Sequence, residues 1–213
     1  RRETWDEAVT RVEDMHLEKY KFLGDEDKNE IRWAFSMVRD KRVLPSMRSM
    51  QFGGKAQLAH EARGYNCCVR HIDSLRAFAE IGYLMLCGCG TGIGLSKHFL
   101  SRLPDLVGPQ DKTGSLLPYV IEDTIEGWAD AIEALLQCYF KNTAYSGRKI
   151  AFDYSKIRRK GTVLKTGGGK APGYKPLKTA LTKIKKLLDR IIEEDHVVTM
   201  RPIHAYDVLM LFA

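Results

Sequence analysis

The sequence predicts an α/β protein that begins with a mostly helical region. Within residues 1–60, apolar side chains recur at the spacing of helices that bury one face. After Tyr65, short apolar runs typical of strands alternate with helical segments and glycine-rich stretches. We therefore expect two domains, a helical region over residues 1–60 and an α/β body over residues 61–213.

Two helices are expected in the N-terminal region. Thr4-Trp5-Asp6-Glu7 has the form of a capping box, and the apolar residues at helical spacing behind it are Trp5, Ala8, Val12 and Met15. A second helix is predicted over residues 27–40, with an apolar face made of Ile31, Ala34, Phe35 and Val38. Pro45 and Gly53-Gly54 indicate irregular chain after it.

The α/β body opens with a short strand at Cys67-Cys68-Val69. A helix from Leu75 to about Leu86 follows, and either Asp73 or Ser74 can cap it. Residues 88–96 indicate a glycine-rich turn, and residues 104–118 indicate a polar loop.

The remaining chain continues this alternation. Asp123-Thr124-Ile125-Glu126 resembles a capping box and starts a helix whose inward residues are Trp128, Ile132, Leu135 and Tyr139. A strand is predicted over residues 149–153, a basic glycine-rich loop over residues 161–173, and a last helix over residues 203–212. Before that last helix, Pro176 starts a long helix with an apolar stripe made of Leu177, Leu181, Ile184, Leu188 and Ile191.

The composition is that of an ordinary globular protein, with 44% hydrophobic and 29% charged residues. No apolar run is long enough to span a membrane, and the N-terminus lacks a secretory signal, so a cytoplasmic protein is expected. The odd count of five cysteines argues against the disulfide framework of small secreted domains. The chain lacks an initial Met and ends in an apolar run, so we expect a piece of a longer protein.

The net charge of +7 is concentrated in one segment. No acidic residue lies between Asp153 and Asp189, and the same stretch holds Lys156, Arg158, Arg159, Lys160, Lys165, Lys170, Lys175, Lys178, Lys183, Lys185 and Lys186. Such a block favours anionic partners, either nucleotides or nucleic acid. A solvated basic face without a partner is equally compatible with the charge alone.

Neither glycine-rich stretch matches the common nucleotide-binding patterns. Gly169-Lys170 is followed by Ala171, where a P-loop needs Ser or Thr. The other stretch alternates as GxGxGxG where a Rossmann fingerprint needs GxGxxG, so a kinase or dinucleotide dehydrogenase is disfavoured. The segment from Gly90 to Ser96 could still offer backbone N–H groups to a phosphate, or could be a tight turn packed on a strand.

The cysteines are weighed between structural, metal-binding and redox roles. Cys87-Gly88-Cys89 has no histidine pair at ligand spacing, so structural zinc is disfavoured and no metal is predicted. Cys67 is either a small buried hydrophobe or, where accessible, a redox thiol. Because adjacent strand residues point to opposite faces, its partner thiol would come from elsewhere than Cys68.

Five segments, in order along nearly the whole chain, resemble the large subunits of ribonucleotide reductases. They are residues 43–48, residues 66–75, residues 86–96 followed by Leu103-Pro104, residues 123–128, and residues 152–177. The last segment, FDYSKIR followed by LKTGGG, is most like the adenosylcobalamin-dependent class II enzymes.

The resemblance implies a fold, an activity and roles for named residues. The fold would be N-terminal helices followed by the first part of a ten-stranded α/β barrel, and the activity would be the radical reduction of ribonucleotides to 2′-deoxyribonucleotides. Cys67 matches the N-terminal member of the redox cysteine pair that reduces the 2′-carbon. Substrate would be contacted by Leu44, Pro45, Ser46, Asn66, Cys67 and Gly92, and a deoxynucleotide effector by Asp73, Ser74 and Leu75. The basic loop from Lys165 to Lys175 would lie near the effector and phosphates.

The resemblance also implies partners. They are a ribonucleotide substrate, a deoxynucleotide effector, a thioredoxin-like reductant, the C-terminal reductase portion, and adenosylcobalamin bound largely by that missing portion. The thiyl cysteine of the family lies in an NxCxE-type motif, which residues 1–213 lack, so this chain alone is expected to be inactive. Leu44 also departs from the Thr that is common before this proline in other classes.

Two alternatives stay open at this point. The chain could be part of a class I reductase, which uses a separate radical-generating subunit. It could also be a non-catalytic basic α/β module that binds nucleotides or nucleic acid, as its acid-free stretch suggests.

Overall fold

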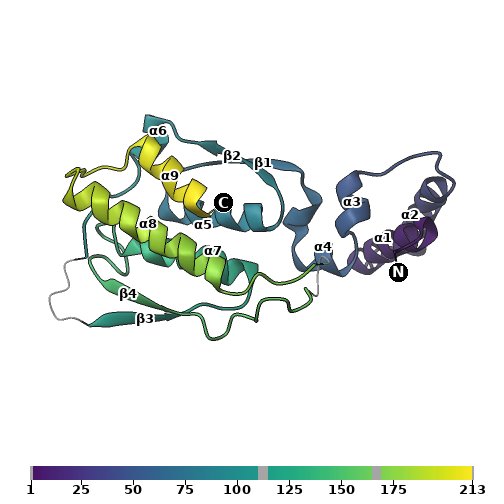
Figure 1. The fold of residues 1–213 in the computed structure, drawn as a ribbon. Coiled ribbons are helices and arrows are strands. Elements are labelled where there is room, and N and C mark those ends of the chain that lie inside the picture. The colour runs from purple at the N-terminus through teal and green to yellow at the C-terminus, as the bar shows by residue number, and fades with distance from the viewer. Residues whose placement is uncertain (1, 110–114, 165–168, 213) are drawn as a thin grey trace. The chain divides into compact units, whose positions relative to one another are not determined.

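The computed structural model describes residues 2–109, 115–164 and 169–212, and its chain divides into two compact units. The first unit consists of residues 1–66 and 164–169, and the second consists of residues 67–163 and 170–213. Figure 1 labels the helices and strands of both. The domain boundary at residue 60 stays a prediction, because the division into compact units does not test it.

The first unit is helical. Its elements are α1 (Trp5–Lys19), α2 (Asp25–Arg39), α3 (Met47–Phe52), α4 (Lys55–Ala59) and the 3-10 helix η1 (Glu61–Gly64). The predicted capping box starts α1, since the Thr4 hydroxyl accepts from the Glu7 backbone N–H and the Glu7 carboxylate accepts from the Thr4 N–H. The predicted apolar face of α2 is correct at Val38, which is buried, but wrong at Ala34, which is exposed.

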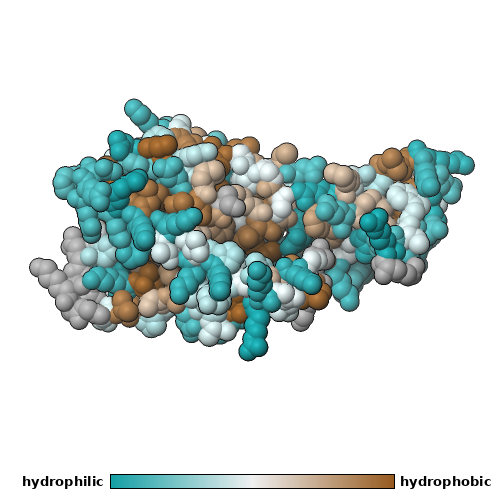
Figure 2. Space-filling view, viewed as in Figure 1, coloured by the Kyte–Doolittle hydropathy of each residue, from teal (hydrophilic) through white to brown (hydrophobic). Residues whose placement is uncertain are grey.

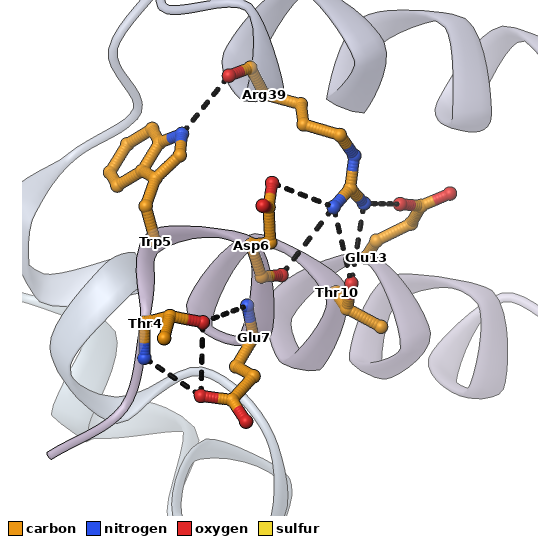
Figure 3. Close-up of polar contacts among 7 residues, drawn as sticks. All are labelled: Thr4, Trp5, Asp6, Glu7, Thr10, Glu13 and Arg39. Carbon is orange, nitrogen blue, oxygen red and sulfur yellow. Dashed lines mark hydrogen bonds and ion pairs between the residues drawn. The ribbon is translucent and has the colours of Figure 1, made fainter.

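Arg39, the last residue of α2, holds the two long helices together (Figure 3). Its guanidinium donates to the Thr10 hydroxyl at 3.3 Å and to the Glu13 carboxylate at 3.1 Å. Its carbonyl oxygen accepts from the Trp5 indole N–H at 3.1 Å. Both the backbone carbonyl and the guanidinium of Arg39 are therefore hydrogen-bonded to α1. Polar contacts as well as packing hold the two helices together.

Short helices occupy the segment that was predicted to be irregular. Ser46 caps α3 by accepting from the Ser49 N–H at 3.1 Å. Gly53 ends α3 where space is lacking, because a Cβ there would lie 2.4 Å from the Ser49 carbonyl oxygen and 2.8 Å from a Val12 methyl. Gly54 follows with a φ of 101°, which favours glycine. The paired glycines therefore mark a close packing point between two short helices.

The second unit is α/β. Its elements are β1 (Cys67–His71), α5 (Leu75–Leu86), β2 (Gly90–Gly94), α6 (Lys97–Leu100), β3 (Leu116–Val120), α7 (Ile125–Gln137), β4 (Lys149–Asp153), α8 (Lys175–Glu193) and α9 (Pro202–Phe212). β1 pairs with β2 in parallel across α5, and β3 pairs with β4 in parallel across α7. The α/β class is confirmed, whereas the ten-stranded barrel stays a prediction.

The core of the second unit lies between its helices. α5 packs against α7, and α8 packs against α7 and α9 (Figure 1). The predicted stripe of α8 is confirmed, since its members are almost fully buried: Leu177, Leu181, Ile184, Leu188 and Ile191. Tyr139, predicted inside α7, follows that helix and is nonetheless buried. Among the described residues, no helix has the length and apolarity needed to cross a membrane.

Two predicted irregular segments contain strands. The stretch predicted as a glycine-rich turn forms β2, because its extended backbone pairs along the whole of β1. The segment predicted as a loop up to Pro118 contains the start of β3, whose Pro118 lies opposite Ala151 of β4. Proline is compatible with an edge strand where its nitrogen faces away from the partner strand, since its missing N–H then removes no ladder bond.

Thr124, rather than Asp123, caps α7, and a glycine follows in the first turn. The Thr124 hydroxyl accepts from the Gly127 N–H at 2.9 Å. A Cβ on Gly127 would lie 2.4 Å from the Glu122 carbonyl oxygen, which is backbone and has little freedom to move. The packing of the β3–α7 connection therefore requires glycine at this helical position.

We predict that Gly127→Ala destabilises the chain by about 1–3 kcal/mol, the usual cost of forcing extra atoms into a packed site. Helix propensity alone predicts the opposite sign. Urea unfolding followed by circular dichroism measures the change. Gly108→Ala is the matched control, because its Cβ would make an ordinary 3.5 Å contact with Ile192. Equal unfolding midpoints for the two variants would contradict the prediction.

Candidate functional site

The parallel pair β1–β2 presents one face to solvent. On β1 the outward residues are Cys67, Val69 and His71, and Val69 is 71% exposed. The register places them opposite Gly90, Gly92 and Gly94 of β2. Because alternate strand residues share a face, this surface combines the side chains of one strand with the bare backbone of the other.

Two glycines of β2 are crowded by side chains of β1. A Cβ on Gly92 would lie 3.2 Å from a Val69 methyl, and one on Gly94 would lie 1.9 Å from the His71 imidazole. That imidazole stacks on Phe99 with a centroid separation of 4.0 Å. Glycine in a strand often marks a place where another group approaches the backbone closely. On this face, β2 is therefore bare backbone at Gly90, beside Cys67, and is overlain by Val69 and His71 at Gly92 and Gly94.

The cysteines separate by exposure. Cys67 is exposed at the start of β1, and Cys68 points to the other face, where its thiol lies 3.4 Å from the Thr91 hydroxyl. Cys87, Cys89 and Cys138 are buried. Burial raises the pKa of the Cys138 thiol to about 11, so it stays protonated at neutral pH. Cys67 thus combines accessibility with a position beside the glycine strand.

The predicted effector residues lie at the start of α5, just after β1. Ser74 is the N-cap of α5 and accepts from the Ala77 N–H at 3.3 Å. The Asp73 carboxylate forms ion pairs with Arg70 at 3.0 Å and with Arg102 at 3.9 Å. Leu75 is buried in the core. Each of the three therefore has a local structural role, and their contact with an effector stays a prediction.

A cavity of about 400 Å³ lies beside these residues, lined by Val69, Arg70, Arg76, Ala79, Glu80, Tyr83, Leu84, Glu126, Ala129 and Asp130. Arg76 of α5 bridges to α7, with contacts of 2.5 Å to Asp130 and 2.9 Å to Glu133. These hydrogen bonds to carboxylates raise the pKa of the Arg76 guanidinium. The cavity therefore has both positive and negative groups on fixed helices.

The remaining predicted substrate residues belong to the first unit, whereas Cys67 and Gly92 belong to the second. Leu44 is 72% exposed, Pro45 follows it, and Ser46 caps α3. Asn66 is exposed, and its side-chain oxygen accepts from the Arg48 guanidinium at 2.8 Å. Within this unit, α3 therefore links the segment from Leu44 to Ser46 with Asn66.

Arg48 lies in this region, and no role was predicted for it from the sequence. Besides holding Asn66, its guanidinium lies 5.2 Å from the centre of the Phe52 ring. Arg63 approaches the same ring at 5.5 Å. The only sequence signal for this arrangement was the presence of Arg48 in the first reductase-like segment, because the pairing with Asn66 crosses 18 residues.

Part of the predicted basic loop, residues 165–168, lies outside the described residues. The described flanks are joined by a bridge between Val163 and Lys170. No group of His, Cys, Asp and Glu side chains suited to a metal ion occurs in the described parts of the chain.

Comparison with known families gives a match over residues 107–188. The matching family model is the insertion domain of B12-dependent ribonucleotide reductase. The matched stretch runs through β3, α7 and β4 and into α8.

Similar curated proteins carry related names. A putative adenosylcobalamin-dependent ribonucleoside-triphosphate reductase of Mycobacterium phage D29 is 27% identical over 91% of this chain. The adenosylcobalamin-dependent ribonucleoside-triphosphate reductase of Euglena gracilis is 42% identical over 46% of it. The chain spans 31% of the length of the phage protein and 13% of the Euglena protein.

A solved structure shares the fold. It is a B12-dependent class II ribonucleotide reductase, matched with a TM-score of 0.81 and 20% sequence identity. The match covers 99% of this chain and 37% of the solved one. Sequence and fold together confirm the resemblance that the five segments indicated.

We predict that Cys67 is the fastest cysteine to react with a thiol reagent in the folded protein. Titration with Ellman's reagent should show one fast thiol, a slower one from Cys68, and three thiols that react only after denaturation, because Cys87, Cys89 and Cys138 are buried. Cys67→Ser should remove the fast phase and Cys68→Ser should leave it. A fast phase that survives Cys67→Ser would show that the exposed thiol is another one.

Proposed function

Starting from this resemblance to the N-terminal part of adenosylcobalamin-dependent class II ribonucleotide reductases, we propose that the chain supplies part of a ribonucleoside-triphosphate reductase. In this proposal Cys67 is one of two thiols that reduce the 2′-carbon of the substrate. The observation that carries it is an exposed thiol at the head of β1, beside a strand whose outward residues are all glycine. The second thiol and the radical-forming residues belong to other parts of the enzyme, and the reductant is a thioredoxin-like partner.

The chemistry assigned to Cys67 balances as a two-electron reduction. The C2′–O bond of the ribose breaks, the hydroxyl leaves as water, and a C2′–H bond forms. The two hydrogens come from two thiols, whose sulfurs join as a disulfide. A thioredoxin-like dithiol then restores the pair by thiol–disulfide exchange. The exposed position of Cys67 suits both contact with substrate and this exchange.

The substrate would lie with its ribose against the glycine face. Gly90, opposite Cys67, carries no side chain and so allows the ring to approach the β2 backbone. Asn66 supplies amide hydrogen-bonding groups at the residue before Cys67, and Arg48 fixes the Asn66 side chain. We propose Leu44, Pro45 and Ser46 as further substrate contacts, and Asp73, Ser74 and Leu75 as the effector region.

The corrin ring of adenosylcobalamin is larger than either of two cavities in the second unit. They measure about 400 Å³ each, a volume for smaller ligands. One is lined by ion-paired side chains and the other by lysines and threonines of α8. We therefore propose that the cofactor is bound by another part of the enzyme, and the chemistry assigned to Cys67 is independent of its placement.

We predict that Cys67→Ser abolishes turnover when it is introduced into the complete reductase of which this chain is a part. The assay measures deoxynucleotide formation from a ribonucleoside triphosphate with adenosylcobalamin and excess dithiol. Serine cannot form the disulfide, so the expected rate is the background without enzyme. Cys68→Ser is the matched control, since Cys68 faces away, and it should keep most of the activity. Undiminished turnover by Cys67→Ser would overturn the proposal.

Residues 1–213 alone should form no deoxynucleotide under the same conditions. None of their five cysteines lies in an NxCxE motif, so the thiyl-forming cysteine of the resembling family is absent from them. Sustained product formation by purified residues 1–213 would contradict this prediction. It would mean that one of the five cysteines of residues 1–213 forms the thiyl radical.

A further inference from the structure

We infer that the exposed face of α8 is a binding surface for single-stranded nucleic acid, a function separate from nucleotide reduction. A shallow groove of about 400 Å³ runs along this helix and is lined by Tyr174, Lys175, Lys178, Thr179, Thr182, Lys183 and Lys186. The space-filling view shows hydrophilic side chains over α8 (Figure 2). At the helical rise, the distance from Lys175 to Lys186 is about 16 Å, long enough to follow several phosphates.

The lysines of the groove are not neutralised by the protein. Lys175, Lys178, Lys183 and Lys186 form no ion pair with any acid in the described parts of the chain. By contrast, Lys185 points elsewhere and pairs with Asp189 at 2.7 Å. The positive charge is therefore confined to one face and is available to an anion.

The placement of these lysines opposes the stability of α8. Lys175 and Lys178 lie in its first turn, which has no acidic residue, although the helix dipole disfavours cations there. Lys175 with Lys178, and Lys183 with Lys186, are like charges at the i,i+3 spacing. Helix α1 differs, since its first turn carries Asp6 and Glu7 and its last turn carries His16 and Lys19. A helix face that serves only solubility would resemble α1, so the lysine row of α8 points to an anionic partner.

An aromatic ring at the head of the groove favours nucleic acid over other anions. Tyr174 is 40% exposed, and its ring lies 5.7 Å from that of Tyr154. Tyr154 in turn lies 6.3 Å from the Phe152 ring, so two further aromatic rings stand behind the exposed one. A basic groove with an exposed aromatic ring is the usual arrangement for single-stranded nucleic acid, in which phosphates meet lysines and a base stacks on the ring.

Two other anionic partners fit less well. An amphipathic helix that inserts into a membrane needs an exposed apolar face, whereas the apolar face of α8 is buried in the core. An acidic peptide would satisfy the lysines but has no planar group for Tyr174. Thr179 adds a hydroxyl group that can donate to a phosphate oxygen, whereas the Thr182 hydroxyl donates to the Lys178 carbonyl oxygen at 2.7 Å.

The test is fluorescence anisotropy with residues 1–213 and a labelled oligothymidylate of about 16 nucleotides. Binding should weaken with salt, with a log–log slope of about −3 when four lysines meet phosphates. The variant K178Q/K183Q/K186Q should reduce the steepness of that slope by about 2. The control K21Q/K97Q/K149Q removes the same charge from exposed positions outside the groove and should leave the slope nearly unchanged. Urea unfolding checks that both variants remain folded.

Substitution of the aromatic residue separates stacking from charge. Tyr174→Ala should weaken binding about tenfold at constant salt slope, whereas Tyr174→Phe should bind as the parent does. Absence of binding at low salt, or equal effects of the two triple variants, would overturn the inference. The inference would also be overturned if duplex DNA of the same length bound as tightly as the single strand. The same holds if polyglutamate of equal charge displaced the labelled strand as well as unlabelled oligothymidylate does.

Discussion

Parallel pairing of the strands is the constraint on which the second unit depends. A parallel pair cannot be joined by a tight hairpin, so each pair needs a crossover segment, here α5 for β1–β2 and α7 for β3–β4. Two strands alone bury too little surface to be stable, and therefore the crossover helices supply the core by packing on each other. The same constraint brings the start of β1 beside the start of β2. That is why Cys67 lies next to Gly90 although 22 residues separate them in the chain.

The features that the sequence predicted well are those encoded by local chemistry. The capping box at Thr4, the helix from Leu75 to Leu86, the strand from Lys149 to Asp153 and the apolar stripe of α8 all follow from short-range period or capping. The strand β2 was missed because glycine weakens strand propensity, and pairing with β1 overrides it. Its signal was present nonetheless, since the glycines recur every second residue and the period of a strand is two. The pairing of Arg48 with Asn66 joins distant positions, and no local pattern encodes it.

The glycines of this chain are required for different physical reasons. Gly127 is required by the close approach of the Glu122 carbonyl, and Gly53 by that of Val12 and Ser49, so both are packing positions. Gly92 and Gly94 are also crowded, but their neighbours are side chains of the exposed face of β1. Crowding there keeps β2 free of side chains on the solvent side. A sequence alone does not separate these cases, because the difference lies in whether the clashing atom is backbone, as at Gly53 and Gly127, or an exposed side chain, as at Gly92 and Gly94.

Helix α8 couples the core to the charged surface. Burial of its five stripe residues contributes roughly 7.5–15 kcal/mol as an upper bound, at about 1.5–3 kcal/mol for each side chain. Repulsion between lysines one turn apart costs only about 0.2–0.5 kcal/mol for each pair. The helix therefore persists with an unfavourable charge distribution, and its apolar face sets the direction in which the lysines point. Since stability neither requires nor benefits from the lysine row, its presence is better explained by what the surface binds than by how the helix folds.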